Sequence, residues 1–408
     1  MLLSFKTELK PNNRQMTQFR QHCGVARHAY NFGNAIILDI LKQRETDKSV
    51  KIPSAMAYAP LRYDLHKRLI AEIKPSNPWY YESSKTSPQQ ALAEVRIAWD
   101  RCFKKVSAQP KFKKKGKSKD SFYLEQGTKA KPAIRHDGKR IKLPKIGWVR
   151  LHETLPISAV HNCVISRPVP ISWFVAIKYE IEKPTVPANR PSVGVDIGIK
   201  ELAVTSDGKV FPNPKAYRKM SKKMKHLQRS VSRKVKGSKN RLKAIRLLGR
   251  HHAKTGNIRK DAIHKLTNYL AKSHSVVKVE DLHIKAFLKN HKLAGAIADC
   301  GMYEFKRQLE YKTEKFSSQL ILVDRFFPSS QICSGCHVHR HRMPLKSRVY
   351  HCPECGHTED RDLNAAKNIE GWFEGIHIPI RSDQTVSSTE IACGADKPFK
   401  SHLETALK

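Results

Sequence analysis

The sequence predicts a multidomain protein in which an α+β half precedes an α/β half. Helical periodicity dominates the early part of the chain, short strands with turn signals follow, and strands alternate with helices from residue 193 onward. Two C-x-x-C pairs add a metal-binding pattern to the second half. With 408 residues, the chain has room for roughly two or three domains that each bury a core.

The charge of the chain indicates its partner. It carries 77 Lys and Arg residues against 36 Asp and Glu residues, which gives a formal net charge of +41. An enzyme for small molecules gains nothing from that self-repulsion, whereas a bound polyphosphate would release many counterions. No apolar run approaches the length of a membrane span, and no basic amphipathic anchor is evident. We therefore predict a nucleic-acid partner and no membrane partner.

The cysteines and the opening residues indicate the compartment. Four of the nine cysteines fall in the two pairs, and the others are scattered singly among apolar residues. An odd count argues against a disulfide framework. The segment from Met1 to Lys6 reads as the start of a strand and lacks the apolar stretch of a signal peptide. We expect a protein of the reducing cytoplasm.

Helical patterns define the first module. Apolar residues at spacings of three and four predict an amphipathic helix over 17–41. Ser87-Pro88 predicts the start of a second helix, because proline fits the first turn after a serine. Residues 58–73 are also expected to be helical. We assign residues 14–106 to a helical recognition module.

Short strands follow the helical module. A lysine-rich segment, residues 104–119, holds eight lysines and no acid, so we expect a mobile loop that contacts polyphosphate, although a solvated linker would look the same. Beyond it, turn signals such as Asp137-Gly138 separate the apolar runs. Residues 107–186 are predicted to form a small β-barrel, completed by residues 1–13. The strands are expected at 121–124, 140–143, 148–151, 164–166 and 173–182.

Strands and helices alternate in the second half. Residues 215–260 hold 18 Lys or Arg residues and no acid, and they predict a pair of long basic helices broken near Gly237. Such helices repel themselves unless a polyanion lies along them, so we expect them to contact nucleic acid. The remaining elements are predicted as strands at 193–198, 202–205, 210–211, 276–279 and 320–323 and helices at 261–273 and 302–318.

Two cysteine pairs predict a zinc site. Cys333 and Cys336 form the first C-x-x-C pair, Cys352 and Cys355 form the second, and 15 residues separate them. This spacing is typical of a four-cysteine zinc ribbon, in which the closed site is structural. Reactive dithiols of a redox protein are the alternative, but the thioredoxin-like context is absent. Several histidines lie nearby, so a histidine could replace one cysteine.

Three acids at the ends of predicted elements form a candidate catalytic set. Asp196 lies on a Val- and Ile-rich strand between Gly194 and Gly198, Glu280 ends another apolar strand, and Asp362 begins a helix. An RNase H-like fold brings these places to one edge of its sheet. Three carboxylates there can hold two Mg²⁺ ions about 4 Å apart for phosphodiester hydrolysis.

Each acid also has a structural alternative and, in two cases, a competing neighbour. Taken singly, Asp196 could be a turn residue, Glu280 a solvated strand end and Asp362 a helix cap. Asp281 could replace Glu280, and Asp360 could replace Asp362. We favour Glu280, because it shares a strand face with Lys278 when the valines face the core. We favour Asp362, because it lies on the helical face of Ala366 and Ile369.

These residues, in this order, resemble the TnpB family of transposon-associated, RNA-guided DNA endonucleases, which are related to the miniature type V CRISPR effectors. The resemblance covers nearly the whole chain, and its last two motifs are specific. The motifs are Arg27-His-Ala-Tyr-Asn31, Pro110-Lys-Phe112, Ile141-Lys-Leu-Pro144, Gly194-Val-Asp-Ile-Gly198, Val279-Glu-Asp-Leu282, Pro328-Ser-Ser-Gln-Ile-Cys333-Ser-Gly-Cys336 and Asp360-Arg-Asp-Leu-Asn-Ala-Ala-Lys-Asn-Ile369.

The resemblance implies a function and its partners. Asp196, Glu280 and Asp362 would be the catalytic, magnesium-binding triad of a RuvC-like, RNase H-like nuclease domain. The four cysteines would hold zinc in a target-nucleic-acid-binding insert. The partners would be a non-coding guide RNA and double-stranded DNA, cut beside a short motif in a prokaryotic cytoplasm or nucleoid. One departure is His337, where relatives often carry glycine.

The resemblance also orders the domains and suggests nucleic-acid contacts. The barrel would be a wedge domain. Residues 187–330 would carry the first two acids, 331–357 the zinc insert and 358–372 the third acid, with 373–408 as a tail of unpredicted role. By the resemblance, Ser87, Gln89 and Gln90 would read the motif. The charge of the lysine-rich segment and of the basic helices adds further candidate contacts: Lys111, Lys113, Lys114, Lys222, Lys223, Arg229 and Arg233.

Other functions explain part of the same pattern. A transposase that joins DNA strands itself would also use an RNase H-like acidic triad. A non-catalytic RNA- or DNA-binding regulator would keep the charge and the zinc site without using the acids. A ribosome-associated zinc-ribbon protein would leave the acids unexplained. The ordered motifs and the intact triad favour the endonuclease.

Overall fold

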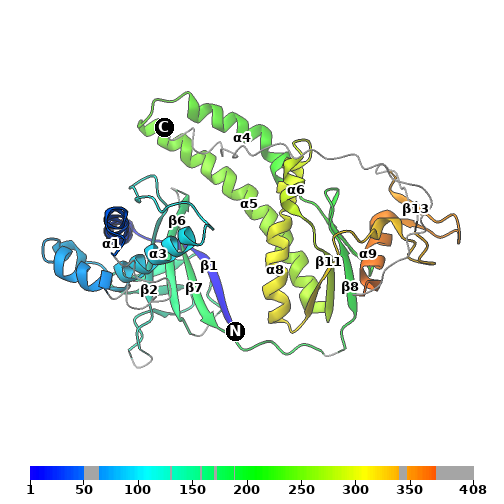
Figure 1. Ribbon diagram of the computed structural model, residues 1–408, viewed down its shortest axis with the longest axis horizontal. Coiled ribbons are helices and arrows are strands. Elements are labelled where there is room, and N and C mark those ends of the chain that lie inside the picture. Colours follow the sequence, from blue (N-terminus) through cyan, green and yellow to red (C-terminus); the bar gives the residue numbers. More distant parts are fainter. Residues whose placement is uncertain are drawn as a thin grey trace. The chain divides into compact units, whose positions relative to one another are not determined.

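The chain divides into two units, Met1–Glu182 and Lys183–Lys408, and each is described by itself. The structure is a computed structural model (Figure 1). None of the helices in its described part has the length and apolarity that crossing a bilayer requires. The described residues are 1–49, 64–128, 131–156, 159–169, 172–187, 189–339 and 347–373.

A seven-stranded antiparallel sheet forms the body of the first unit. Its order is β2-β6-β7-β1-β5-β4-β3, and β1 pairs along its length with β7 and at its end with β5. The predicted role of the N-terminal strand in this body is therefore confirmed. The strand order begins at β2 and ends at β3, so the described residues establish a seven-stranded sheet. Its closure into a barrel stays a prediction. The strands are β1 Leu2–Lys10, β2 Asp120–Glu125, β3 Arg135–His136, β4 Arg140–Leu143, β5 Gly147–Leu151, β6 Asn162–Val169 and β7 Ser172–Glu180.

Two long helices pack against each other and against this sheet. Helix α1 spans Asn13–Thr46 and begins with a capping box between Asn12 and Gln15, which is why it starts before the predicted residue 17. Helix α3 spans Thr86–Phe103. Apolar residues from both helices and the sheet make one buried core. Of the predicted helix at 58–73, residues 58–63 lie outside the described residues, and the rest is helical and ends in the π-turn η1, Leu69–Ile73. A 3₁₀ turn, η2, follows at Pro78–Tyr80.

The lysine-rich segment 104–119 is anchored at its centre. Asn31 of α1 accepts a hydrogen bond from the Lys113 amide and donates one to the Lys113 carbonyl, at 2.8 and 2.9 Å. Asn34 donates to the Pro110 carbonyl at 3.4 Å. The lysine count alone predicted a mobile loop and could not reveal these contacts, because they depend on asparagines far away in the sequence.

A five-stranded sheet forms the core of the second unit, in the order β10-β9-β8-β11-β12. The strands β8, β11 and β12 run parallel, so their carboxyl ends lie at one edge of the sheet. The strands are β8 Ser192–Asp196, β9 Glu201–Thr205, β10 Val210–Pro212, β11 Val276–Glu280 and β12 Gln319–Val323.

Helices cover both faces of this sheet (Figure 1). Helices α5, Lys239–Ser273, and α8, Met302–Lys315, pack on one face through Leu266, Leu270 and Phe305. Helix α9, Arg361–Gly371, lies on the other face along β8. The second unit is therefore a three-layer arrangement with the sheet in the middle.

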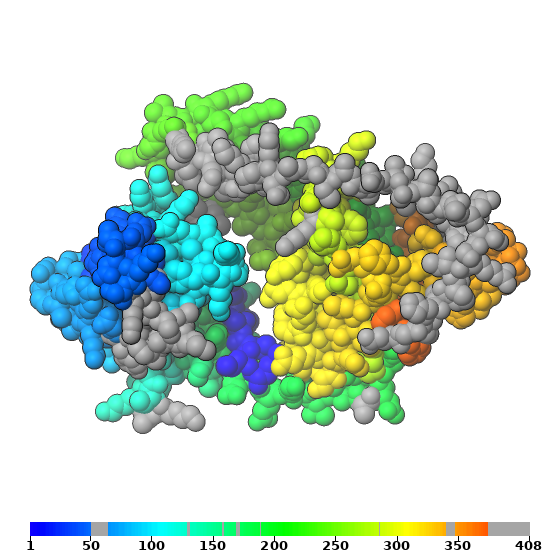
Figure 2. All heavy atoms as spheres, in the orientation of Figure 1, coloured from blue at the N-terminus to red at the C-terminus, as the bar shows by residue number. Residues whose placement is uncertain are grey.

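The basic segment forms two helices. Helix α4 spans Ala216–Ser232 and packs on α5 through Met224, Leu227 and Val231. The predicted separate helix at 261–273 is wrong, because α5 runs unbroken from Lys239 to Ser273 through both Gly249 and Gly256. Figure 2 shows side chains of this helix pair as a projecting green lobe.

Two short helices between β11 and α8 were not predicted. They are α6, Ile284–Lys289, and α7, Ala294–Cys300. Asp299 of α7 is buried, and its carboxylate accepts hydrogen bonds from the backbone amides of Tyr217 and Arg218 at the start of α4. The basic helix α4 is thus capped by a residue from a distant part of the chain.

Candidate active site and zinc knuckle

Asp196 and Glu280 end two neighbouring parallel strands. Val195 of β8 lies opposite Val279 of β11, so the next residue on each strand is the acid. The valines are buried against α5 and α8. Because side chains alternate along a strand, the two acids lie on the opposite face, the face that α9 covers.

Helix α9 brings Asp362 to the same edge. Four residues of a helix rise about 6 Å, close to the roughly 6.6 Å that two residues of a strand span. Ser192 donates to the Glu370 carboxylate at 2.6 Å, and a Cβ added to Gly194 would lie only 2.0 Å from the Ala366 carbonyl oxygen. Ser192 thus lies beside Glu370, and Gly194 lies beside Ala366. Two residues further along β8 and four residues back along α9, Asp196 lies beside Asp362.

The competing neighbours of these acids are engaged elsewhere. Asp360 caps α9, because its carboxylate accepts hydrogen bonds from the amides of Asp362 and Leu363. Asp281 pairs with Lys306 at 2.8 Å and Arg325 at 3.0 Å, and hydrogen bonds to these cations lower its pKa. Both neighbours therefore have structural partners, as the choice of Glu280 and Asp362 requires.

Electrostatics link the three acids. Burial, together with the negative charges of Glu280 and Asp362, raises the pKa of Asp196 to about 7. Burial also raises the pKa of Glu280, against a hydrogen bond from Ser329 that lowers it. Arg348 Nη1 lies 3.7 Å from Asp362 Oδ1. The surroundings of Asp196 disfavour its ionised form. A divalent cation bound beside it would stabilise that form.

The donor set of this edge fits magnesium. Carboxylate oxygens are the hard ligands that Mg²⁺ prefers. Among the described residues, the four cysteine sulfurs lie close enough together to hold one metal ion. The carboxylate oxygens of the three acids lie farther apart than these sulfurs do. Two cations about 4 Å apart need a wider spread of oxygens than one zinc ion does.

The pKa of Asp196 predicts how metal binding depends on pH. A carboxyl pKa that folding raises stabilises the fold at low pH, and this contribution is lost as the pH rises through the folded value of about 7. A Mg²⁺ ion that binds Asp196 would have to displace this proton, so its apparent affinity should fall about tenfold per pH unit below 7. We expect a larger Mg²⁺-induced rise in melting temperature at pH 8 than at pH 6, measured by thermal unfolding. The same difference in Asp196→Asn would contradict this.

The four cysteines meet at one point. Their sulfur atoms lie within 4.8 Å of one another, with Cys333 Sγ 3.7 Å from Cys355 Sγ and Cys336 Sγ 3.6 Å from Cys352 Sγ. Tetrahedral zinc with Zn–S bonds of about 2.3 Å separates its ligands by about 3.8 Å. The thiols therefore fit a zinc ion. The strands β13, Val349–His351, and β14, Thr358–Asp360, flank the second pair.

Two histidines beside this cluster, His357 and His337, have local structural features of their own, and His341 lies outside the described residues. His357 Nε2 lies 3.2 Å from Ser334 Oγ and 3.5 Å from the Glu359 carboxylate, beside the sulfur cluster. His337 has a φ of 59°, in the left-handed region where glycine is favoured. The turn that follows the first cysteine pair thus has a backbone conformation that glycine adopts more readily than histidine does.

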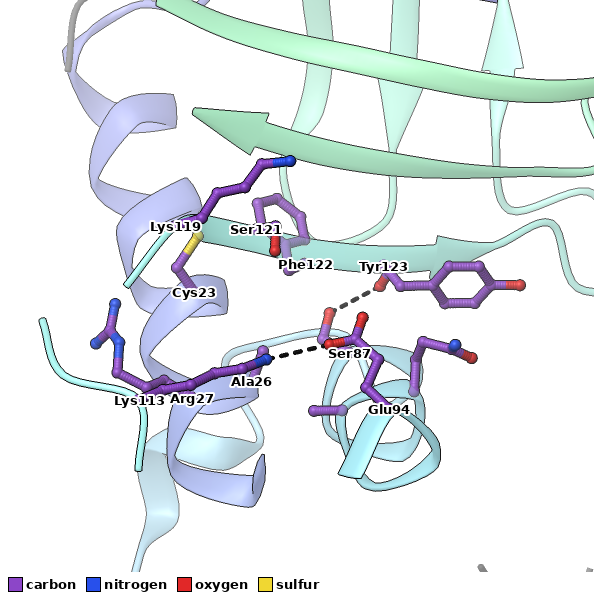
Figure 3. A pocket seen from close by; sticks show the side chains of 12 residues that line it. Cys23, Ala26, Arg27, Ser87, Glu94, Lys113, Lys119, Ser121, Phe122 and Tyr123 are labelled. Atoms are coloured by element: carbon purple, nitrogen blue, oxygen red, sulfur yellow. Dashed lines mark hydrogen bonds and ion pairs between the residues drawn. The ribbon is translucent and has the colours of Figure 1, made fainter. Parts of the chain in front are cut away.

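The candidate DNA-reading residues on α3 differ in access. Ser87 is buried, and its hydroxyl donates to the Tyr123 carbonyl at 3.0 Å, so it ties α3 to β2 (Figure 3). Gln89 and Gln90 are half-buried, and Gln90 lines a small pocket with Lys119. The glutamines keep an accessible side chain, and the serine does not.

The pocket in Figure 3 is surrounded by ion pairs. Lys113 Nζ lies 3.2 Å from the Glu94 carboxylate and 3.8 Å from the centre of the Tyr30 ring. Arg27, which also lines the pocket, pairs with Asp120 at 2.9 Å. The Lys113 ammonium is therefore engaged inside the first unit.

The other basic candidates are exposed. Lys222, Lys223 and Arg229 of α4 are exposed, as is Arg233 directly after the helix, and Lys111 and Lys114 are exposed in the lysine-rich segment. Their charges are free to meet a polyanion in solution.

Three polar residues around the acids were missed from the sequence. Ser329 donates to Glu280, while Asn364 and Asn368 of α9 bond to the segment before Cys333. Lys278 Nζ donates to the carbonyls of Glu370 and Trp372 at 2.6 and 2.7 Å, capping the end of α9. The four-residue spacing of the two asparagines from one another was the available signal.

Comparisons with known proteins match three parts of the chain to family models. Residues 176–291 match a family described as "Probable transposase", residues 303–369 match "Cas12f1-like, TNB domain" and residues 1–46 match "Helix-turn-helix domain". The last of these forms the strand β1 and the single helix α1 in this structure.

Relatives cover most of the chain. A protein of Streptomyces pristinaespiralis named "Putative RNA-guided DNA endonuclease" is 37% identical over 292 residues, 71% of each chain. The Escherichia coli K12 protein named "Putative RNA-guided DNA endonuclease InsQ" is 32% identical over 387 residues, covering 90% of this chain and 91% of that protein. This chain belongs to the TnpB family.

A solved structure shares the fold of this TnpB protein. The chain resembles a protein in the cryo-EM structure of a Cas12f1–sgRNA–target DNA complex with a TM-score of 0.56 and 14% sequence identity, over 87% of this chain and 82% of that one. The likeness establishes a Cas12f1-like fold for this TnpB protein.

Proposed function

We propose that this protein is an RNA-guided, Mg²⁺-dependent DNA endonuclease encoded by a transposon. The observation that carries the proposal is the meeting of Asp196, Glu280 and Asp362 at one sheet edge, linked through their charges. Family membership and the net charge of +41 agree with nucleic-acid partners. In this reading, residues 187–330 and 358–372 are a RuvC-like nuclease domain, and 331–357 are its zinc-containing insert.

The roles of the residues follow from their positions. Asp196, Glu280 and Asp362 would hold two Mg²⁺ ions, and Cys333, Cys336, Cys352 and Cys355 would hold zinc. Bound magnesium would activate water and stabilise the leaving 3′-oxygen of the cut strand. The protein supplies fixed carboxylates: β8 and β11 hold two in register, and the capped first turn of α9 holds the third.

Nucleic acid would be bound by sites in both units. The exposed Lys222, Lys223 and Arg229 of α4, with Arg233 directly after the helix, would supply sequence-independent contacts to phosphate. Gln89 and Gln90 can donate and accept hydrogen bonds at a base edge, which suits them to read a short motif beside the target. A guide RNA would then supply most of the sequence specificity by base pairing.

The test begins with the RNA that the protein carries. We expect the purified full chain to contain one discrete RNA that overlaps the end of its own gene, identified by small-RNA sequencing. Programmed with that RNA, the protein should cut a plasmid library in Mg²⁺ only where a matching target adjoins a particular motif. Cutting that ignores the guide sequence would contradict RNA guidance.

Two alternatives remain as outcomes of the same experiment. The matching family description "Probable transposase" keeps open a protein that joins DNA strands itself, and joined strands in the cleavage reaction would reveal it. Guided binding without any cut in Mg²⁺ or Mn²⁺ would instead indicate a non-catalytic regulator.

A further inference from the structure

Ser329 is a buried residue whose side chain meets the acidic edge. It begins the 3₁₀ turn η3, Ser329–Gln331, and only 6% of its surface is exposed. Its hydroxyl donates a short hydrogen bond to Glu280 Oε1. This bond connects a proposed magnesium ligand to the segment that leads directly into Cys333.

Two asparagines of α9 hold the same segment. Asn368 Nδ2 donates to the carbonyls of Ser329 at 2.8 Å and Ile332 at 2.7 Å. Asn364 Nδ2 also donates to the Ile332 carbonyl at 2.7 Å, and its Oδ1 accepts from the Ser334 amide at 2.9 Å. Both side chains are at least nine-tenths buried, where an unbonded amide would be costly. These bonds fix the backbone on both sides of Cys333.

The contacts form two routes from the cysteine cluster to the acids. One runs from Cys333 back along the chain to Ser329 and on to Glu280. The other runs from Ile332 and Ser334 through Asn364 to α9, whose first turn carries Asp362. Both acids are thus held by the segment that provides the first zinc ligand.

We propose that Ser329 is a positioning residue for Glu280, and that the bonds of Asn364 and Asn368 couple an ordered zinc knuckle to the acidic edge. Groups that hydrogen-bond to a metal ligand orient it and raise metal affinity, and their loss costs about 10- to 100-fold. The inference rests on the proposed role of Glu280 and Asp362 as magnesium ligands.

The test compares Ser329→Ala with a matched control. The control is Ser330→Ala, whose hydroxyl is the next in the chain and bonds to Arg361 instead of an acid of the triad. The full chain is purified with its bound RNA, and its zinc content and metal-free melting temperature show that each variant is folded. The first measurement is the Mn²⁺ concentration that gives half of the maximal thermal shift. The second is the Mg²⁺ concentration for half-maximal cleavage.

We expect Ser329→Ala to raise both concentrations about tenfold while retaining zinc, and to recover most cleavage at saturating Mg²⁺. Ser330→Ala should match the wild type. Ser329→Thr keeps the hydroxyl and should restore part of the affinity, which a purely structural role would not predict. Wild-type protein stripped of zinc by dialysis against a chelator, with the chelator then removed, should lose its Mn²⁺-induced shift.

The outcomes separate the two proposals. If Ser329→Ala shows wild-type metal concentrations in both measurements, the positioning role is overturned and the nuclease proposal stands. If the wild type binds Mn²⁺ but never cuts, the nuclease proposal fails, and the Mn²⁺ shift of Ser329→Ala still decides the positioning role. A wild type with no Mn²⁺ response overturns both. An unchanged Mn²⁺ shift after zinc removal overturns the coupling.

Discussion

Asp196→Asn should abolish DNA cleavage while the protein still binds its RNA. The substitution removes one charge from an acidic edge where burial and neighbouring charges already raise the pKa of Asp196 to about 7. Losing a metal-ligand charge removes several kcal/mol of transition-state stabilisation, a fall in rate of about a thousandfold or more. The rate is measured on a guided target in Mg²⁺, and RNA retention is measured by gel shift.

A neighbouring acid supplies the control for this experiment. Asp281 follows Glu280 directly, but its carboxylate pairs with Lys306 and Arg325. We expect Asp281→Asn to keep cutting and Glu280→Gln to behave like Asp196→Asn. Wild-type rates in Asp196→Asn, or an inactive Asp281→Asn beside an active Glu280→Gln, would refute the assignment of the triad.

Gly194→Ala should disable the protein without touching any charged residue. A Cβ at this position would lie 2.0 Å from the Ala366 carbonyl oxygen and 2.4 Å from the Glu370 amide nitrogen, and these backbone atoms cannot rotate away. Helix α9 would have to leave β8 and take Asp362 with it. Overpacking of this kind costs about 3 kcal/mol, and we expect both a lower melting temperature and strongly reduced cleavage.

Another glycine separates this effect from ordinary helix or strand propensity. Gly256 lies within α5, and an added Cβ there meets nothing within 4 Å. Gly256→Ala should therefore leave cleavage unchanged and raise stability slightly, because alanine favours a helix. Cleavage by Gly194→Ala at the wild-type rate, with an unchanged melting temperature, would show that α9 does not rest directly on β8.

Local patterns predicted the elements of this protein better than their contacts. Alternating apolar residues and glycine-containing turns located every strand of both sheets except the two-residue β3, because side-chain alternation is written directly in a strand's sequence. The division of residues 239–273 into two helices was wrong, because α5 continues through Gly249, Gly256 and the predicted boundary at residue 260. The short helices α6 and α7 lacked enough periodicity to be seen.

The candidate site shows the same limit. The cysteine spacing predicted that the four thiols would meet, and the structure confirms that their sulfur atoms cluster. This was predictable because the two cysteines of each pair lie close together in sequence. The resemblance suggested Ser87 as a residue that reads DNA, yet its side chain turns inward to Tyr123. Ser329, Asn364 and Asn368 escaped notice because their partners depend on how α9 docks on β8. Such contacts between distant segments leave no periodic signal.

The place of α9 in the chain has a consequence for protein synthesis. The sheet and its covering helices α5 and α8 are complete by residue 323, but the third acid arrives only at residue 362, on the helix laid over the sheet's open side. A ribosome that stalls before this point would release a fragment that can bind polyanions through α4. The fragment would lack one of the three proposed ligands of the two Mg²⁺ ions. If the proposed triad is correct, a chain that ends before α9 would not cleave DNA, because one of its three acids would be missing.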